Sequence, residues 1–108
     1  METYYQEVKA GQCLDFEIID NTTSLFIKHI SIIPTPQENG NIIVYILKDN
    51  EKKILCRVNE KLTPNVNCLY TVIDHGKVVN KLHFEGVGSV SVIGYSIVDE
   101  NYSEMEIE

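Results

Sequence analysis

The chain has no tryptophan, few cysteines and no long apolar run, and these absences narrow the classes of protein to which it could belong. Cys13, Cys56 and Cys68 form no CxxC pair and are odd in number, so we expect a reducing compartment and no disulfide framework. Cys56 and Cys68 alternate in phase with apolar neighbours and are interpreted as small buried hydrophobes. No apolar stretch approaches the length of about 20 residues that crosses a bilayer, and no secretory signal precedes the body. These features predict a soluble, intracellular protein.

Positive charge is also scarce, which argues against direct binding of nucleic acid. The formal net charge is −7, and residues 99–108 carry five carboxylates with no lysine or arginine. The other 98 residues hold 11 acids and nine bases, so the body is nearly neutral. Nucleic-acid binding needs a basic footprint, whereas a concentrated acidic end suits a basic partner or simple solubility. The candidate binding carboxylates are Asp99, Glu100, Glu104, Glu106 and Glu108.

Hydrophobic patterning indicates one all-β domain, and 108 residues suit a single core. Short runs rich in β-branched residues are separated by turn signals, and no segment has convincing helical periodicity. We expect an eight-stranded sandwich, jelly roll or barrel over residues 1–98, followed by a flexible acidic tail over residues 99–108. The expected strands are 6–10, 13–19, 24–33, 41–48, 53–60, 65–73, 78–85 and 89–98.

Two of these predicted strands, 24–33 and 41–48, carry apolar side chains on both alternating faces. A two-sheet sandwich needs only its inner faces to be apolar, so something must cover the outer ones. Contacts between identical subunits are the simplest cover, because a large exposed apolar patch is unusual for a monomer. The sequence therefore predicts a homo-oligomer.

No residues form a recognisable catalytic or metal-binding pattern. His29, His75 and His83 lie in three different predicted elements and match no HxxxH, HxH or Cys/His spacing. No nucleophile motif or phosphate-binding loop occurs, and the glycines at 86 and 88 are better explained by a tight turn and a bulge. We expect no enzyme activity, no metal and no cofactor.

Three stretches resemble, in order, motifs of the nucleoplasmin-like domain family. Residues 5–11 read YQEVKAG and are similar to the family's opening, in which an aromatic precedes an E-V-K-x-G pattern. Residues 54–56, ILC, followed by LTP at 62–64, resemble a strand and turn in the middle of that domain. Residues 84–95 read FEGVGSVSVIGY and resemble its closing signature, G-x-G-S-V-x-x-x-G-Y. The residues that match this signature, interpreted as structural, are Gly86, Gly88, Ser89, Val90, Gly94 and Tyr95.

This family includes nucleoplasmin histone chaperones, N-terminal domains of nuclear FKBP-type immunophilins, and plant nuclear histone-deacetylase-type proteins. The resemblance implies an eight-stranded jelly roll that assembles as a pentameric ring, with a decamer of two rings left open. It also implies a chaperone of core histones, in the nucleus or nucleolus, that binds through acidic segments. In a longer FKBP-type protein, a prolyl-isomerase domain would follow the chain.

Two other readings stay open. A carbohydrate-binding jelly roll would need exposed aromatics on one face, for which Tyr45, Tyr70 and Tyr95 are candidates, although the lack of tryptophan weighs against it. A purely structural oligomerisation domain of a larger protein would need no partner beyond its own copies. Loss of histone binding on removal of residues 99–108 would separate the chaperone from both.

Overall fold

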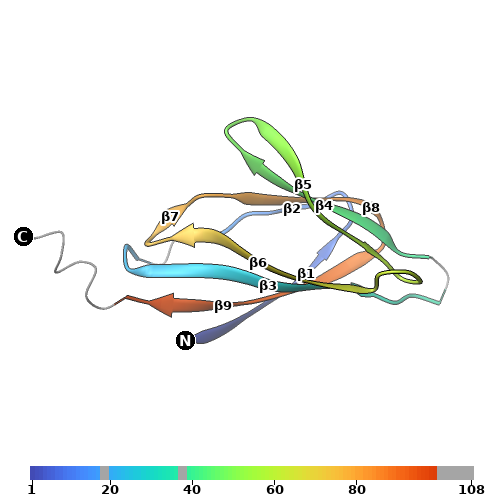
Figure 1. Ribbon diagram of the computed structural model, residues 1–108, viewed down its shortest axis with the longest axis horizontal. Coiled ribbons are helices and arrows are strands. Elements are labelled where there is room, and N and C mark those ends of the chain that lie inside the picture. The colour runs from blue at the N-terminus through green and yellow to red at the C-terminus, as the bar shows by residue number, and fades with distance from the viewer. Residues whose placement is uncertain (18–19, 37–38, 100–108) are drawn as a thin grey trace, which may run out of the picture.

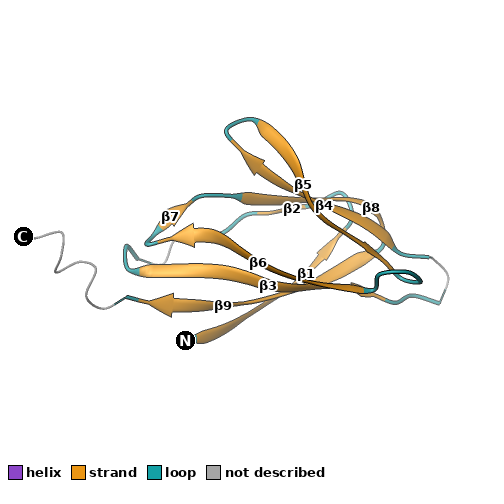
Figure 2. Ribbon diagram, in the orientation of Figure 1, coloured by secondary structure: helices purple, strands orange, loops and turns teal. Residues whose placement is uncertain are grey.

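The computed structural model describes residues 1–17, 20–36 and 39–99, and these form a β-sandwich (Figure 1). Figure 2 shows only strands, turns and loops over the described residues, which contain no helix that could span a membrane. All strand pairs are antiparallel. Sheet 1 has the order β1-β9-β3-β6-β7, and sheet 2 has the order β2-β8-β4-β5. The strands are β1 (Glu2–Lys9), β2 (Cys13–Leu14), β3 (Thr23–Ile33), β4 (Asn41–Lys48), β5 (Glu51–Asn59), β6 (Asn65–Asp74), β7 (Lys77–Val78), β8 (Lys81–Val87) and β9 (Ser89–Val98).

The core lies between the two sheets and is filled by the inward side chains of both. Ile27 and Ile30 of β3 are three residues apart yet both fully buried, because a register shift between Ile27 and His29 changes the alternation. In sheet 2, the paired residues Val44 and Phe84 are also fully buried. Burying one such side chain contributes about 1.5–3 kcal/mol, so this layer is the main source of stability. The largest fully buried side chains are Phe84, Ile27, Ile30, Ile42, Leu82, Val44, Val58, Val72, Val90 and Val92.

Glycines shape the end of the sandwich where the chain passes from sheet 2 to sheet 1. Gly88 alone separates β8 from β9 and has a φ of 107°. Gly86 has a φ of 133°, and a Cβ there would clash with the carbonyl oxygen of Asn41 on β4. A Cβ at Gly88 would come 3.3 Å from the Cα of Gly40. We call Gly40, Gly86 and Gly88 the glycine end; here backbones approach too closely for larger residues.

The rest of the closing signature lies on β9, the second strand of sheet 1. Ser89 begins the strand and Val90 is fully buried. A Cβ at Gly94 would clash with the carbonyl oxygen of Phe26 on β3. Tyr95 stacks on the ring of Phe26, with the ring centroids 5.2 Å apart. These residues therefore connect β9 closely to β3 on both faces of the sheet.

The described residues form nine strands where the sequence predicted eight, because residues 78–85 do not form one strand. β7 pairs with β6 in sheet 1, whereas β8 pairs with β4 in sheet 2. Val79 and Asn80 connect the two sheets between them. A run of β-forming residues does not show that the chain changes its hydrogen-bonding partner halfway.

Other boundaries also differ from the prediction. β1 begins at Glu2 and ends at Lys9, where the prediction was 6–10, and two further boundaries differ for related reasons. In the predicted strand 13–19, Phe16 is buried and Glu17 is exposed as the alternation requires, but strand pairing ends at Leu14, and residues 18–19 lie outside the described residues. Asp49 and Asn50 have φ values of 51° and 65°, which makes a two-residue hairpin turn, so β5 begins at residue 51 and not 53. Alternation of apolar and polar residues in the sequence indicates which side chains are buried. It does not indicate where the backbone forms hydrogen bonds with a neighbouring strand.

Candidate functional site

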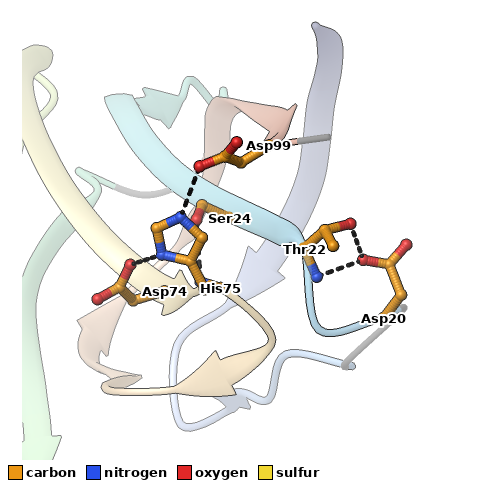
Figure 3. A network of polar contacts seen from close by, with 6 residues as sticks. All are labelled: Asp20, Thr22, Ser24, Asp74, His75 and Asp99. Carbon is orange, nitrogen blue, oxygen red and sulfur yellow. Dashed lines mark hydrogen bonds and ion pairs between the residues drawn. The ribbon is translucent and has the colours of Figure 1, made fainter. Parts of the chain in front are cut away.

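The end of β9 is fixed beside two other segments of sheet 1. Because β9, β3 and β6 are neighbouring antiparallel strands, the last residues of β9 lie next to the start of β3 and the end of β6. The N–H of Asp99 donates to the carbonyl oxygen of Thr22, at 3.0 Å. The Oδ2 atom of Asp99 lies 3.4 Å from Nε2 of His75 in the β6–β7 turn (Figure 3). The first carboxylate of the predicted tail is thus held in a defined position.

His75 joins two carboxylates at this end. Its Nδ1 lies 2.8 Å from Oδ1 of Asp74, while Nε2 faces Asp99, so the ring lies between the two acids. The backbone N–H of His75 donates to Oγ of Ser24, at 3.0 Å, and its φ is 45°. The next N–H, at Gly76, donates to the carbonyl oxygen of Thr23, at 2.9 Å. The turn is therefore attached to β3 by backbone and side-chain hydrogen bonds.

Asp20 supplies a third carboxylate in the loop that precedes β3. Its Oδ1 accepts hydrogen bonds from the N–H and Oγ1 of Thr22, at 2.8 and 2.7 Å (Figure 3). It also accepts one from Oγ1 of Thr23, at 2.9 Å. These bonds, those from Thr22 most strongly, hold the pKa of Asp20 below its ordinary value of 3.8. Asp20 thus keeps its negative charge well into the acidic range.

We call Asp20, Asp74 and Asp99 the acidic end. They come from three segments far apart in sequence, and the side chains of Asp74 and Asp99 are 60% and 45% exposed. Of the carboxylates predicted from sequence, Asp99 lies here. The others, Glu100, Glu104, Glu106 and Glu108, lie outside the described residues.

Sequence reasoning missed Asp20 and Asp74 because each stands in an ordinary turn signal, Asp-Asn-Thr at 20–22 and Asp-His-Gly at 74–76. Aspartate is common in such turns for local reasons, so its presence alone says nothing about a binding surface. The strand order brings both turns beside Asp99. A correct prediction of the β9-β3-β6 order would have found them.

The other titratable side chains form small local contacts. His83 lies between Sγ of Cys13, at 3.0 Å, and Oε1 of Glu85, at 3.1 Å. His29 lies 2.6 Å from Oδ1 of Asn67. No group of three or more potential metal ligands occurs among the described residues. None of these contacts adds to the acidic end.

Cys56 of β5 and Cys68 of β6 face each other across the two sheets. Both are half-buried against the core, and a hydrogen bond that Cys56 donates to Cys68, followed by burial, raises the pKa of the Cys56 thiol. Their partial burial agrees with the expected apolar role, although neither is fully buried. Cys13 is exposed.

The three candidate tyrosines do not form one aromatic platform. Tyr45 belongs to sheet 2 and lies beneath Lys52, whose Nζ is 4.3 Å from the ring centroid. Tyr95 is on sheet 1, and Tyr70 is packed against the core. A sugar-binding face built from all three is therefore incompatible with this arrangement.

Sheet 1 instead has an apolar patch on its outer face. Tyr5 of β1 pairs with Ile93 of β9, and Tyr95, two residues further along the same face, stacks on Phe26. Leu69 of β6 borders the same shallow groove as Ile93 and Tyr95. Leu69 and Tyr5 are 69% and 56% exposed, which is unusual for side chains of this size. We call Tyr5, Phe26, Leu69, Ile93 and Tyr95 the apolar patch.

Two solved structures share this arrangement of strands. The nucleoplasmin-like N-terminal domain of Drosophila FKBP39 superposes with a TM-score of 0.68 at 18% identity, covering 91% of this chain and 89% of that one. The core of Drosophila NLP superposes with a TM-score of 0.68 at 16% identity, covering 90% of this chain and 99% of that one. Its crystal structure provides insight into pentamer formation and histone binding by that protein. The chain has the nucleoplasmin-like fold. No protein-family model and no curated protein sequence matches it.

Proposed function

We propose that this chain is a histone chaperone domain of the nucleoplasmin type, which binds basic histones through acidic residues. The observation that carries the proposal is the acidic end, where carboxylates from three separate segments lie at one end of the sandwich. One of them, Asp99, begins the tail, which carries four further carboxylates in its sequence. Histones carry dense positive charge, and clustered exposed carboxylates attract such a partner at long range without a deep pocket. The chain also shares its fold with the NLP core, whose crystal structure provides insight into histone binding, and this likeness supports the proposed function.

The proposed assembly is a pentameric ring in which the apolar patch is buried between subunits. Five exposed or half-exposed apolar side chains on one sheet face are a sufficient reason for self-association. The description of the NLP core for pentamer formation makes five the expected number. A ring would bring five acidic ends and five tails together, so that weak individual contacts act jointly.

The remaining parts of the proposal follow from the partner. A histone chaperone acts in the nucleus, needs no catalytic group, and uses negative charge, which disfavours direct contact with DNA or RNA. The two alternative functions, a sugar-binding module and a purely structural oligomerisation domain, both predict that the chain does not bind histones. Titration of the chain with fluorescently labelled core histones therefore tests the function directly. Saturable binding that weakens with added salt supports it, and absence of binding at low salt contradicts it.

The assembly has its own test. Replacing Leu69 with lysine places a charge in the apolar patch and should convert the pentamer to smaller species, measured by sedimentation velocity. Leu62→Lys is the matched control, because Leu62 is 86% exposed in the β5–β6 loop and lies outside the patch. Equal sedimentation of both variants with wild type would show that the patch is not the subunit interface.

A further inference from the structure

Lysines gather around the β4–β5 hairpin, which projects from the body of the sandwich (Figure 1). A groove of about 730 Å³ lies between the tip of this hairpin and residues 77–81, the segment that connects sheet 1 to sheet 2. Four of the nine basic residues of the chain line it, against two carboxylates, Asp49 and Glu51. The lysines are Lys48, Lys52, Lys77 and Lys81. The lining residues alone carry two more positive than negative charges, in a chain of net negative charge.

Two of these lysines are paired and two are not. Lys52 lies 2.9 Å from Glu85, and Lys81 lies 3.5 Å from Asp15. Among the described residues, no ion pair is formed by Lys48 or Lys77. Two ammonium groups on opposite walls of the groove are therefore available to an acidic ligand.

The groove also contains a buried acceptor. Asn80 is only 8% exposed, and its Nδ2 donates to the carbonyl oxygen of Thr71, at 2.9 Å. Its Oδ1 is buried and has no hydrogen-bond partner among the described residues. A buried oxygen without a donor is costly, so a small movement at Asn80 that admitted a donor from the groove would be stabilising. A peptide carries both backbone N–H donors and, when acidic, carboxylates for the lysines.

The acidic tail starts beside this groove. Asp99 lies 3.4 Å from His75, and His75 precedes Lys77 by two residues. The nine residues from 100 to 108 can extend at most about 30 Å from this point. In sequence, Glu104, Glu106 and Glu108 alternate with Met105 and Ile107. The groove offers apolar contacts as well as charge, through Leu47, Val78 and Val79.

We propose that the lysine groove binds the acidic segment 100–108 of the same chain. The tail would then be engaged by the groove in the absence of histones and released when a histone competes for it. Docking itself does not depend on histones; the competition rests on the proposed function. The affinity of the chaperone for histones would then depend on competition between the histone and the lysine groove for the same acidic segment.

Cross-linking in the full chain tests the docking. A carbodiimide joins lysine amines to nearby carboxylates, and mass spectrometry identifies each joined pair. We expect tail glutamates joined mainly to Lys48, across the groove, with the yield independent of dilution and lost at high salt. Lys77 lies close to the tail root and is not diagnostic. Equal yields at Lys48 and at Lys61, exposed in the β5–β6 loop outside the groove, would overturn the proposal, as would yields at Lys48 that salt does not reduce.

Lysine substitutions separate this proposal from the histone function. Lys48→Gln with Lys77→Gln should tighten histone binding by about threefold to tenfold, because the docked state that competes with histones loses two surface ion pairs. Lys9→Gln with Lys61→Gln removes the same charge outside the groove and should tighten histone binding less. Histone binding without the cross-links overturns only the docking. Cross-links without any histone binding support docking and contradict the proposed function.

Discussion

The two ends of the sandwich are built by different physical means. At the glycine end, backbones approach closely, and Gly86 and Gly88 adopt φ values that other residues rarely reach. At the acidic end, three segments are joined by hydrogen bonds and polar contacts of partly exposed side chains around His75. Substitutions at closely packed backbones are strongly destabilising, whereas substitutions in exposed polar contacts usually change stability little. The glycine end should therefore determine stability, and the acidic end should determine binding.

The largest expected effect is at Gly86. Gly86→Ala should lower the free energy of unfolding by about 3 kcal/mol, because the added Cβ meets the carbonyl oxygen of Asn41 and the φ of 133° is unfavourable. Gly11→Ala is the matched control, since Gly11 has a φ of 93° but no atom within 4 Å of the added Cβ. It should cost only about 1 kcal/mol. Urea denaturation measures both, and equal losses would show that close approach is not the cause.

The next effect is on binding alone. Changing Glu104, Glu106 and Glu108 to glutamine should weaken histone binding by about tenfold at low salt, because several charge contacts are lost together. The same change at Glu2, Glu7 and Glu17 removes equal charge from the body and should weaken binding much less. The midpoint of urea denaturation should change little in either variant. Equal loss in both would mean that net charge, and not its position, determines affinity.

A smaller effect should appear in the pH dependence of stability. Asp20 has a folded-state pKa below 3.8, so its hydrogen bonds with Thr22 and Thr23 add stability that is fully present above the unfolded-state pKa. Asp20→Asn should therefore melt below wild type at neutral pH. The difference should close as the pH falls below 3.8 through the lowered folded-state value. A difference of constant size down to the lowest accessible pH would contradict a contribution from the Asp20 charge.

The smallest effect is expected for His75→Asn. Asparagine tolerates the φ of 45° and keeps the backbone N–H that donates to Ser24, so the turn should persist. The contacts of the ring with Asp74 and Asp99 are lost, and we expect a change of less than about 1 kcal/mol in the free energy of unfolding. A loss comparable to that of Gly86→Ala would show that the acidic end also determines stability.

The sequence was informative where burial and local conformation decide the structure. The run from Ser89 to Val98 forms β9 with the predicted bounds, because alternation and flanking glycines define it locally. The sequence was uninformative where partners decide. Asn80 stands between two strands of different sheets, and no local signal marks that change.

The same distinction holds for the site. Asp99 was found because it begins a concentrated run of acids, whereas Asp20 and Asp74 join it only through the β9-β3-β6 order. Likewise, Lys48 and Lys77 stand far apart in sequence and line one groove only because of the position of the hairpin. Contacts between distant segments depend on topology, which single-residue patterns do not contain.

One measurement tests the central claim most directly: multi-angle light scattering of the full chain with and without core histones. The chain alone should have a mass of about 62 kDa, five times its 12.3 kDa. With histones at about 0.15 M salt the mass should rise, and at about 1 M salt it should return to that of the pentamer. A 12.3 kDa species that histones leave unchanged at low salt would contradict both the assembly and the function.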